Sequence, residues 1–384
     1  MALKSGLAAQ LGVVKETTWG VPATVTQFVP LVSESLTHEV ERLESAGIIA
    51  GRQILTDDQW ADGNIVASGD AQFELYTRSM GRLWEAAFGT VDTQAAAALY
   101  EHTFWVANER PSLTVQVGKP SVAGTVEPWT FTGMKVAEMD IAFSAGEIVT
   151  CGVSFAGKWA IRHRSVTDGV TTSGGSLVTS ATASFSSDDV GKPLSGGSIV
   201  AGATITSVTD AATAVLSGTS TAAGTAVTLA IGVPLAAASY SSGLVPYTFR
   251  HGTATLDGSA VQVKSGNIKI TNGLDVERRF LGQGHISEPL HNELTMVDGA
   301  LTLEFTDETQ YDTYVAGGTV PLALAFAGES DRAAYLNATV RYDGSTPQVA
   351  GREILEQEVP FKVVAGASDA AAVSGTIINA DSAV

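Results

Sequence analysis

Residues 65–89 read IVASGDAQFELYTRSMGRLWEAAFG, a stretch in which an alternating pattern gives way to a helical one. In its first part, apolar or small side chains alternate with polar ones, which predicts a strand with one buried face. In its second part, apolar side chains recur at helical spacing and charged ones occupy the opposite face, which predicts a short helix. Gly89 can end that helix. The sequence therefore predicts a strand that leads directly into a helix.

The C-terminal part of the chain repeats this design. Residues 299–318 read GALTLEFTDETQYDTYVAGG, again a strand pattern followed by a short helix and glycines. The segments 69–74 and 299–304 have the same spacing around their glycines, and a Glu-Arg pair precedes each unit, at 41–42 and 277–278. These similarities predict an internal duplication. Chance similarity between two strand–helix units is the alternative.

Between the two copies the composition changes. From about residue 166 to 239 the chain consists mainly of Ser, Thr, Ala, Gly and Val, with almost no aromatic residues. Short apolar runs between glycine-containing turns predict a small all-β module there, because flexible linkers lack such runs. We expect a mainly β (all-β or α+β) chain with one helix flanking each copy. The expected parts are a first domain (1–165), an inserted domain (166–240), a second domain (241–366) and a mobile tail (367–384).

Composition excludes several classes of protein. The 384 residues include 22 Lys and Arg against 40 Asp and Glu, a net charge of −18, which argues against tight binding to duplex nucleic acid. With 45% hydrophobic and 16% charged residues, the chain is unlike disordered proteins. The single cysteine, Cys151, excludes an intrachain disulfide and a multi-cysteine zinc site, and its alternating strand predicts a buried, inert thiol.

Motifs for catalysis, membranes and secretion are missing from the sequence. It contains no HExxH, G-x-S-x-G or Walker A pattern, so we predict no catalytic, metal-binding or cofactor-binding residues. The apolar runs are too short for a transmembrane helix, which predicts no membrane insertion. The N-terminus lacks a clear cleavage site and predicts a cytosolic start.

An acidic cluster follows residue 33. Glu39, Glu41 and Glu44 lie in a stretch with strand character. One interpretation is a solvated sheet edge. The other is an acidic surface that keeps polyanions from adhering, as the lining of a conduit would.

Several turn and core segments resemble those of one family. They are GVVKETTWGVP at 12–22, GIIAGR at 47–52, the strand–helix unit at 69–89, and FTGMKV at 131–136. The family is the major tail tube proteins of long-tailed, siphovirus-type bacteriophages. The inserted stretch at 180–216 resembles a small module common in phage structural proteins.

The resemblance implies a β-sandwich or half-barrel in each tube domain, with a helix at its side. It also implies rings of six tube domains that stack into a hollow tube, located in the virion and made in the host cytoplasm. Two tube-like copies in one chain predict a trimeric, pseudo-sixfold ring, and a hexamer is the alternative. The implied partners are a tape measure protein, a tail terminator and tail tip proteins. Phage DNA would pass through without adhering.

Site residues follow from this resemblance and from strand-edge pairing between subunits. We expect Glu39, Glu41 and Glu44 to line the lumen and the inserted domain to project outward. The expected contacts within and between rings are Trp19, Ile48, Ile49, Arg52, Ile54 and Trp60. A carbohydrate-binding adhesin and a β-rich glycan hydrolase are the alternative functions. Between about residues 166 and 239 the inserted module lacks Trp and Tyr and has Phe185 as its single Phe, whereas sugar sites use exposed aromatic residues. A hydrolase would need convergent acids.

Overall fold

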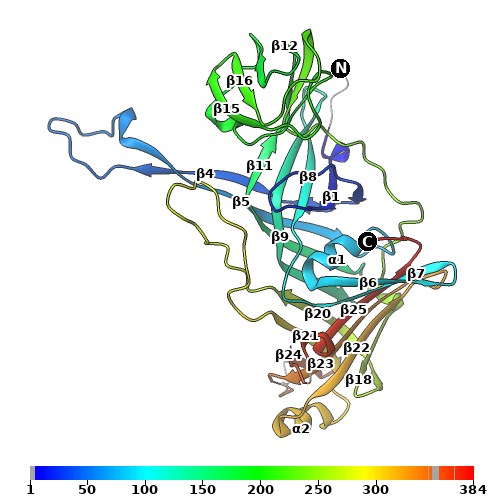
Figure 1. Ribbon diagram of the computed structural model, residues 1–384. Helices are drawn as coiled ribbons and strands as arrows, with labels where there is room; N and C mark the ends of the chain where they lie inside the picture. The colour runs from blue at the N-terminus through cyan, green and yellow to red at the C-terminus, as the bar shows by residue number, and fades with distance from the viewer. Residues whose placement is uncertain (1–4, 345, 348–353, 367) are drawn as a thin grey trace.

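A computed structural model describes residues 5–344, 346–347, 354–366 and 368–384. Within these residues the strands form one sheet system of 19 strands and a separate sheet of 6. We call residues 5–165 the first half, residues 166–240 the insert, and the described residues from 241 onward the second half. Figure 1 shows the insert above the first half and the second half below it.

The first half is a sandwich of two sheets that share the long strand β9 (Val126–Ser144). The beginning of β9 pairs with β8 and β11, and its end pairs with β10 and β20. The helix α1 (Gly81–Phe88) buries its apolar side chains in the core. The remaining strands are β1 (Gln10–Lys15), β2 (Gln27–Val29), β3 (Ser33–Glu34), β4 (Thr37–Glu44), β5 (Trp60–Glu74), β6 (Gly89–Ala96), β7 (Leu99–Val106), β8 (Leu113–Pro120), β10 (Thr150–Gly157) and β11 (Trp159–Arg162).

The second half repeats the strand–helix unit of the first half. Gly69 of β5 lies opposite Phe155, and Gly299 of β21 lies opposite Phe361, so the two copies share a register as well as a pattern. A side-chain carbon at Gly299 would lie 2.2 Å from the backbone carbonyl oxygen of Asn267 and 2.7 Å from the Phe361 ring, which explains the glycine. The elements are β18 (Gly252–Leu256), β19 (Ser259–Val261), β20 (Val263–Thr271), β21 (Met296–Glu304), α2 (Thr309–Ala316), β22 (Val320–Ala327), β23 (Ala333–Tyr342), β24 (Glu356–Val363), α3 (Asp369–Ala372) and β25 (Val373–Asn379).

Two strand pairings join the halves. The end of β9 pairs antiparallel with β20, from Ser144 opposite Ser265 to Glu138 opposite Thr271. Strand β7 pairs antiparallel with β25 near the C-terminus. Strand pairing therefore continues from one half into the other at two places, and one hydrophobic core extends through both halves.

The second pairing corrects one expectation. Residues 367–384 were expected to form a mobile tail, and residue 367 lies outside the described residues. Residues 368–384, however, contain α3 and β25, and β25 lies between β7 and β23. Val373, Gly375, Ile377 and Asn379 are buried in alternation. Strand β25 packs tightly between its neighbours, and small side chains fit there. The small residues of this segment therefore reflect close packing and not mobility.

The insert has its own sheet and its own core, built around Phe185, Leu229 and Ile231. Asp189 anchors it, because this buried carboxylate pairs with Arg164 at 2.6 Å and with Lys192 at 2.9 Å. Burial raises the pKa of Asp189, but these partners outweigh burial and lower it to about 2. The strands are β12 (Arg164–Thr171), β13 (Leu177–Thr179), β14 (Leu194–Ser195), β15 (Ile205–Asp210), β16 (Thr213–Leu216) and β17 (Gly224–Ile231).

Cys151 is a free and fully buried thiol, as its strand pattern predicted. Burial raises its pKa to about 12, with a smaller contribution from Asp140, so the reactive thiolate is suppressed. No helix in the described ranges is long and apolar enough to cross a membrane.

Candidate functional site

The two halves together present one continuous polar face on seven paired strands, β4, β5, β10, β9, β20, β21 and β24. Alternation along each strand turns the apolar side chains toward the core and the polar ones away from it. The acidic side chains on the polar face are Glu39, Asp70, Glu74, Glu138, Asp140, Asp298, Glu304, Glu356 and Glu358, and the lysines are Lys264, Lys269 and Lys362. Acidic groups therefore dominate this face.

Polar contacts on this face cross the joint between the halves. Asn267 donates a hydrogen bond of 2.9 Å to Asp140, and Lys269 Nζ lies 3.4 Å from Glu138 Oε2. Within the first half, Ser154 donates to Asp70 at 2.6 Å. Because most of these groups are partly exposed, each contact contributes little to stability. Their effect is to fix the register of two strands that come from different halves.

Of the three acids expected to line a lumen, Glu39 lies on this face, opposite Val66. Glu41 follows an irregularity in the β4–β5 register, and its carboxylate accepts hydrogen bonds from the backbone and side chain of Asn64. Glu44 lies farther out, opposite Trp60. The structure therefore does not bring the three carboxylates together on the sheet.

Sequence reasoning missed most of the acids of the polar face. Asp70, Asp140 and Asp298 each alternate with buried residues in their own strands, and that signal was available. That these acids lie on one face could not be predicted from the sequence, because it depends on which strands pair.

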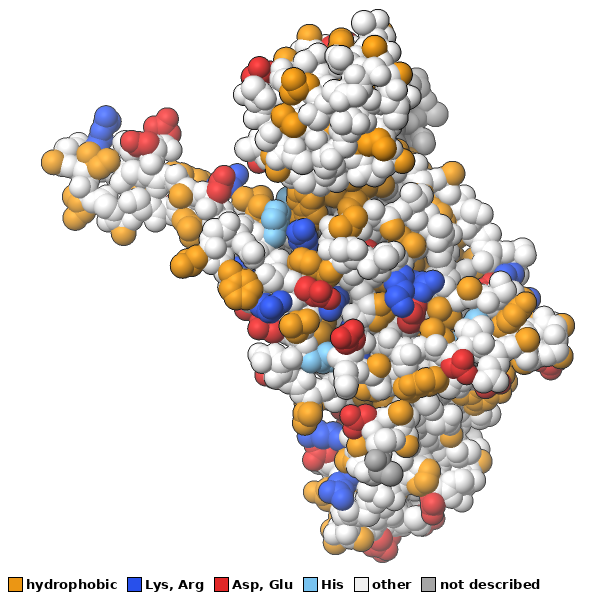
Figure 2. Space-filling view, in the orientation of Figure 1, with side chains coloured by type: hydrophobic (Ala, Val, Ile, Leu, Met, Phe, Trp, Pro, Cys, Tyr) orange, Lys and Arg blue, Asp and Glu red, His pale blue; other side chains and the backbone are white. Residues whose placement is uncertain are grey.

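A two-stranded arm projects from the edge of this sheet. It consists of residues 40–65, where β4 and β5 continue beyond the body of the molecule, and Figures 1 and 2 show it extending sideways with apolar side chains near its end. Ile48 is 98% exposed, Ile54 83% and Trp60 50%. Ile49 and Arg52 are exposed beside them. Such a concentration of exposed apolar side chains is typical of a protein contact site.

Trp19 lies apart from the arm and already has partners within the chain. Its indole Nε1 donates a 3.1 Å hydrogen bond to the Gly133 carbonyl, and Lys158 Nζ lies 5.3 Å from its ring centroid. The loop that carries it is organised by the buried Glu16. That carboxylate accepts hydrogen bonds from Gly20 N, Ser112 Oγ, Thr114 Oγ1 and Gly133 N.

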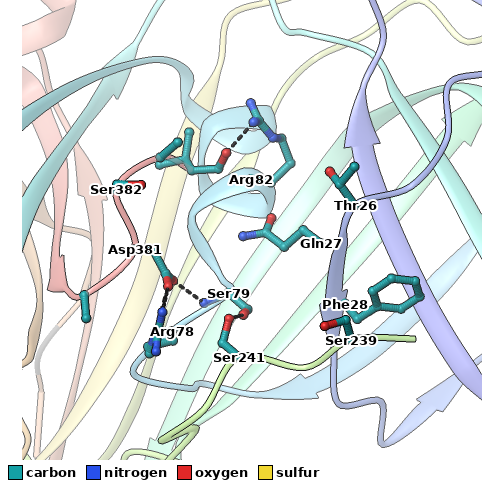
Figure 3. Close-up of a pocket in the computed structure, with 13 residues that line it drawn as sticks. Thr26, Gln27, Phe28, Arg78, Ser79, Arg82, Ser239, Ser241, Asp381 and Ser382 are labelled. Carbon is teal, nitrogen blue, oxygen red and sulfur yellow. Dashed lines mark hydrogen bonds and ion pairs between the residues drawn. The ribbon is translucent and has the colours of Figure 1, made fainter. Parts of the chain in front are cut away.

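A polar cavity of about 350 Å³ lies beside the start of α1 (Figure 3). Its charged groups bind one another. Asp381 accepts hydrogen bonds from Arg78 Nε at 2.7 Å and from the Ser79 backbone at 2.9 Å, and Arg82 donates a hydrogen bond to the backbone carbonyl of Val384. These contacts hold the segment after β25 against α1, so this cavity serves the joint between the halves.

The comparison with protein families gives two matches along the chain, which overlap within the insert. The family described as phage tail tube protein matches the chain twice, over residues 6–211 and 197–363. The chain belongs to this family. It is therefore a structural protein of the phage tail tube and a virion component. The predicted membership of the tail tube proteins and the predicted mainly β fold are confirmed. A comparison with curated proteins gives no match.

Membership of the tail tube family indicates what the exposed surfaces of this protein would contact. A tail tube protein assembles with copies of itself and with other tail components. The polar sheet face, the free strand edges and the arm are the surfaces of this tail tube protein that remain to be assigned within such an assembly. Nothing in the described part of the chain favours an adhesin or a glycan hydrolase.

Proposed function

We propose that three copies of this tail tube protein close a pseudo-sixfold ring, and that stacked rings form the channel through which phage DNA reaches the host. The observation that supports this proposal is the β9–β20 pairing, which joins two tube domains edge to edge within one chain. One domain–domain joint of the ring would thus be internal to each chain, and the next would lie between chains.

The free edge of β4 supports the joint between chains. Strand β4 pairs with β5 as β20 pairs with β21, so the two strands occupy equivalent places. The other edge of β20 is covered by β9, whereas no strand in the described part of the chain pairs with the other edge of β4. Unpaired edges favour strand addition, and a head-to-tail contact of this kind closes into a ring when the rotation permits.

The mass of an isolated ring tests this proposal. Three chains of 39.6 kDa give about 119 kDa by native mass spectrometry, which is the expected result. A ring of six chains would refute the trimer and leave the tube function in place. A protein that forms neither rings nor tubes at any concentration would refute both.

The polar face is assigned to the lumen in this proposal, with Glu39 among its acids. Acidic groups repel the phosphate backbone, so DNA would move through without binding. The other expected lumen acids, Glu41 and Glu44, would lie where the arm leaves the sheet. The insert follows β11, which belongs to the sheet on the other side of the core, and this supports an outward position for it.

Reversing charge on the polar face is expected to make the ring bind DNA. In the variant Asp298→Lys/Glu358→Lys, a trimeric ring gains six lysines. Its affinity for a short labelled duplex should fall by up to about 1,000-fold between 50 and 200 mM salt. Fluorescence anisotropy measures this, and wild-type rings should not bind.

The matched control reverses two exposed acids of the insert, in Asp188→Lys/Asp210→Lys. If this control binds DNA as tightly as the first variant, the assignment of the polar face to the lumen is wrong.

The remaining partners follow from the same proposal. The tape measure protein would occupy the channel before DNA enters, and the tail terminator and tip proteins would cap the two ends of a siphovirus-type tail. The inter-ring and inter-subunit contacts would come from Ile48, Ile49, Arg52, Ile54 and Trp60 of the arm, and from the Trp19 loop. We assign the protein no enzymatic step.

A further inference from the structure

We infer that the apolar face of α2 is covered, in the assembled ring, by the first half of a second copy of this chain, beginning at the root of its arm. This inference rests on the proposed ring. It names a contact that edge-to-edge strand pairing alone does not specify.

The two helices occupy equivalent places but have different surroundings. Each follows the strand whose glycine lies opposite a phenylalanine of the neighbouring strand, Gly69 in β5 or Gly299 in β21. In α1, the side chains of Leu83, Trp84 and Phe88 are fully buried. In α2 no residue is buried, and the apolar side chains are exposed: Tyr311 (38%), Tyr314 (38%) and Val315 (65%).

Part of what covers α1 comes from the second half of the same chain. Gly375 of β25 lies so close to α1 that a side-chain carbon there would be 2.6 Å from the Trp84 ring. Asn272, directly after β20, donates a 3.0 Å hydrogen bond to the Ala87 carbonyl at the end of α1. Asp381 binds the segment just before α1 (Figure 3). The helix α1 is therefore part of the joint between one tube domain and the next.

Another part of the cover on α1 has no equivalent on α2. The hairpin of β6 and β7 follows α1 and packs on it through Phe104, whose ring centroid lies 5.7 Å from that of Trp84. After α2, the chain passes through Gly317 and Gly318 and enters β22 at Val320. The hairpin that follows α2, formed by β22 and β23, leaves Tyr311, Tyr314 and Val315 of that helix exposed.

The position of α2 matches the joint between chains. Figure 1 shows α1 at the junction of the two halves and α2 at the opposite end of the second half. In the proposed ring, a rotation by one tube domain superimposes α2 on α1. Because α1 lies against the second half of its own chain, α2 would lie against the first half of the next copy. A hydrogen bond of 2.7 Å from Tyr342 to Gln310 keeps α2 seated on its own half.

The register identifies which part of the second copy would arrive there. Thr271 lies opposite Met296 and Glu39 opposite Val66, so Val40 at the root of the arm is the counterpart of Asn272. Asn272 is the residue that reaches the end of α1. Val40 is 37% exposed and apolar, and so suits the exposed aromatic face of α2.

Photo-cross-linking in isolated rings tests this contact. Benzoylphenylalanine at Tyr314 preserves an aromatic side chain at a surface position, so the chain should still fold. We expect irradiation to give a two-chain product, and peptide mass spectrometry to place the link within residues 33–66 of the second chain. The control carries the same probe at Leu177, which is 52% exposed on the insert, and should give no such product.

The outcomes separate this inference from the ring itself. Rings of the expected mass without an interchain link from position 314, or with a link to the second half of the other copy, overturn the inference and leave the ring intact. Absence of both rings and links overturns both. As a second readout, Tyr311→Ser/Tyr314→Ser should raise the concentration needed for ring formation at least tenfold, with an unchanged unfolding transition of the free chain.

Discussion

Replacing Trp84 by alanine is expected to lower the free energy of unfolding of the unassembled chain by about 3–5 kcal/mol, the range for removing a large aromatic side chain from a core. Trp84 is fully buried, and its ring contacts Phe88 and Phe104 at centroid distances of 5.9 and 5.7 Å. Gly375 from the other half packs against it, so the alanine variant opens a cavity at the joint. Urea unfolding followed by far-UV circular dichroism measures the effect.

Two further variants check that the loss of stability comes from the cavity left by the Trp84 side chain. The Trp84 Nε1 group is buried and has no hydrogen-bond partner in the described structure, so Trp84→Phe removes a costly donor and should lose only about 1 kcal/mol. Trp60→Ala changes the same residue type on the exposed arm and should leave the unfolding curve unchanged. A loss below about 1 kcal/mol in Trp84→Ala would contradict the role of this side chain in the joint.

Replacing Ile48 and Ile54 by serine is expected to prevent tube formation at concentrations where the wild type assembles. Both side chains are almost fully exposed in the free chain, so the variant should fold normally. If each isoleucine is buried on assembly, the pair contributes about 3 kcal/mol or more per arm. A loss of this size corresponds to at least about a 100-fold weaker contact. Negative-stain electron microscopy over a concentration series measures it.

The matched control for the arm lies on the insert. Leu177→Ser/Val170→Ser also removes two exposed apolar side chains, which are 52% and 40% exposed, and should leave assembly unchanged. Tubes that form normally in the Ile48→Ser/Ile54→Ser variant would show that the arm makes no essential contact.

Secondary structure was predictable where the pattern of apolar and polar residues within one segment determines it. The pattern of residues 65–89 predicted both β5 and α1, and the helix ends where Gly89 adopts a φ of 108°. The same reasoning located the second strand–helix unit, because its spacing repeats. Both signals are local, since alternation and helical spacing reflect which faces of a single element are buried.

The joint between the halves was not predictable, because strand pairing is not encoded locally. Nothing in β9 or β20 alone specifies that Ile141 lies opposite Ile268. The polar face shows the same limit, since its acids come from strands distributed along the chain and meet only through that pairing. Glu39 was found because it belongs to a run of nearby acids, whereas Asp140 and Asp298 were missed because their neighbours on the face come from strands distant in the sequence.

The pairing of β7 with β25 has a consequence for biosynthesis. His102, beside the first helix, is hydrogen-bonded to the carbonyl of Asp381, which lies 279 residues later in the chain. At about 5–20 residues per second, roughly 15 to 55 seconds of translation separate the two partners. During that interval α1 lacks part of its cover and the joint is unfinished. A partly synthesised chain therefore lacks the completed joint between the halves, and we expect only chains whose synthesis has passed residue 381 to enter a growing tail.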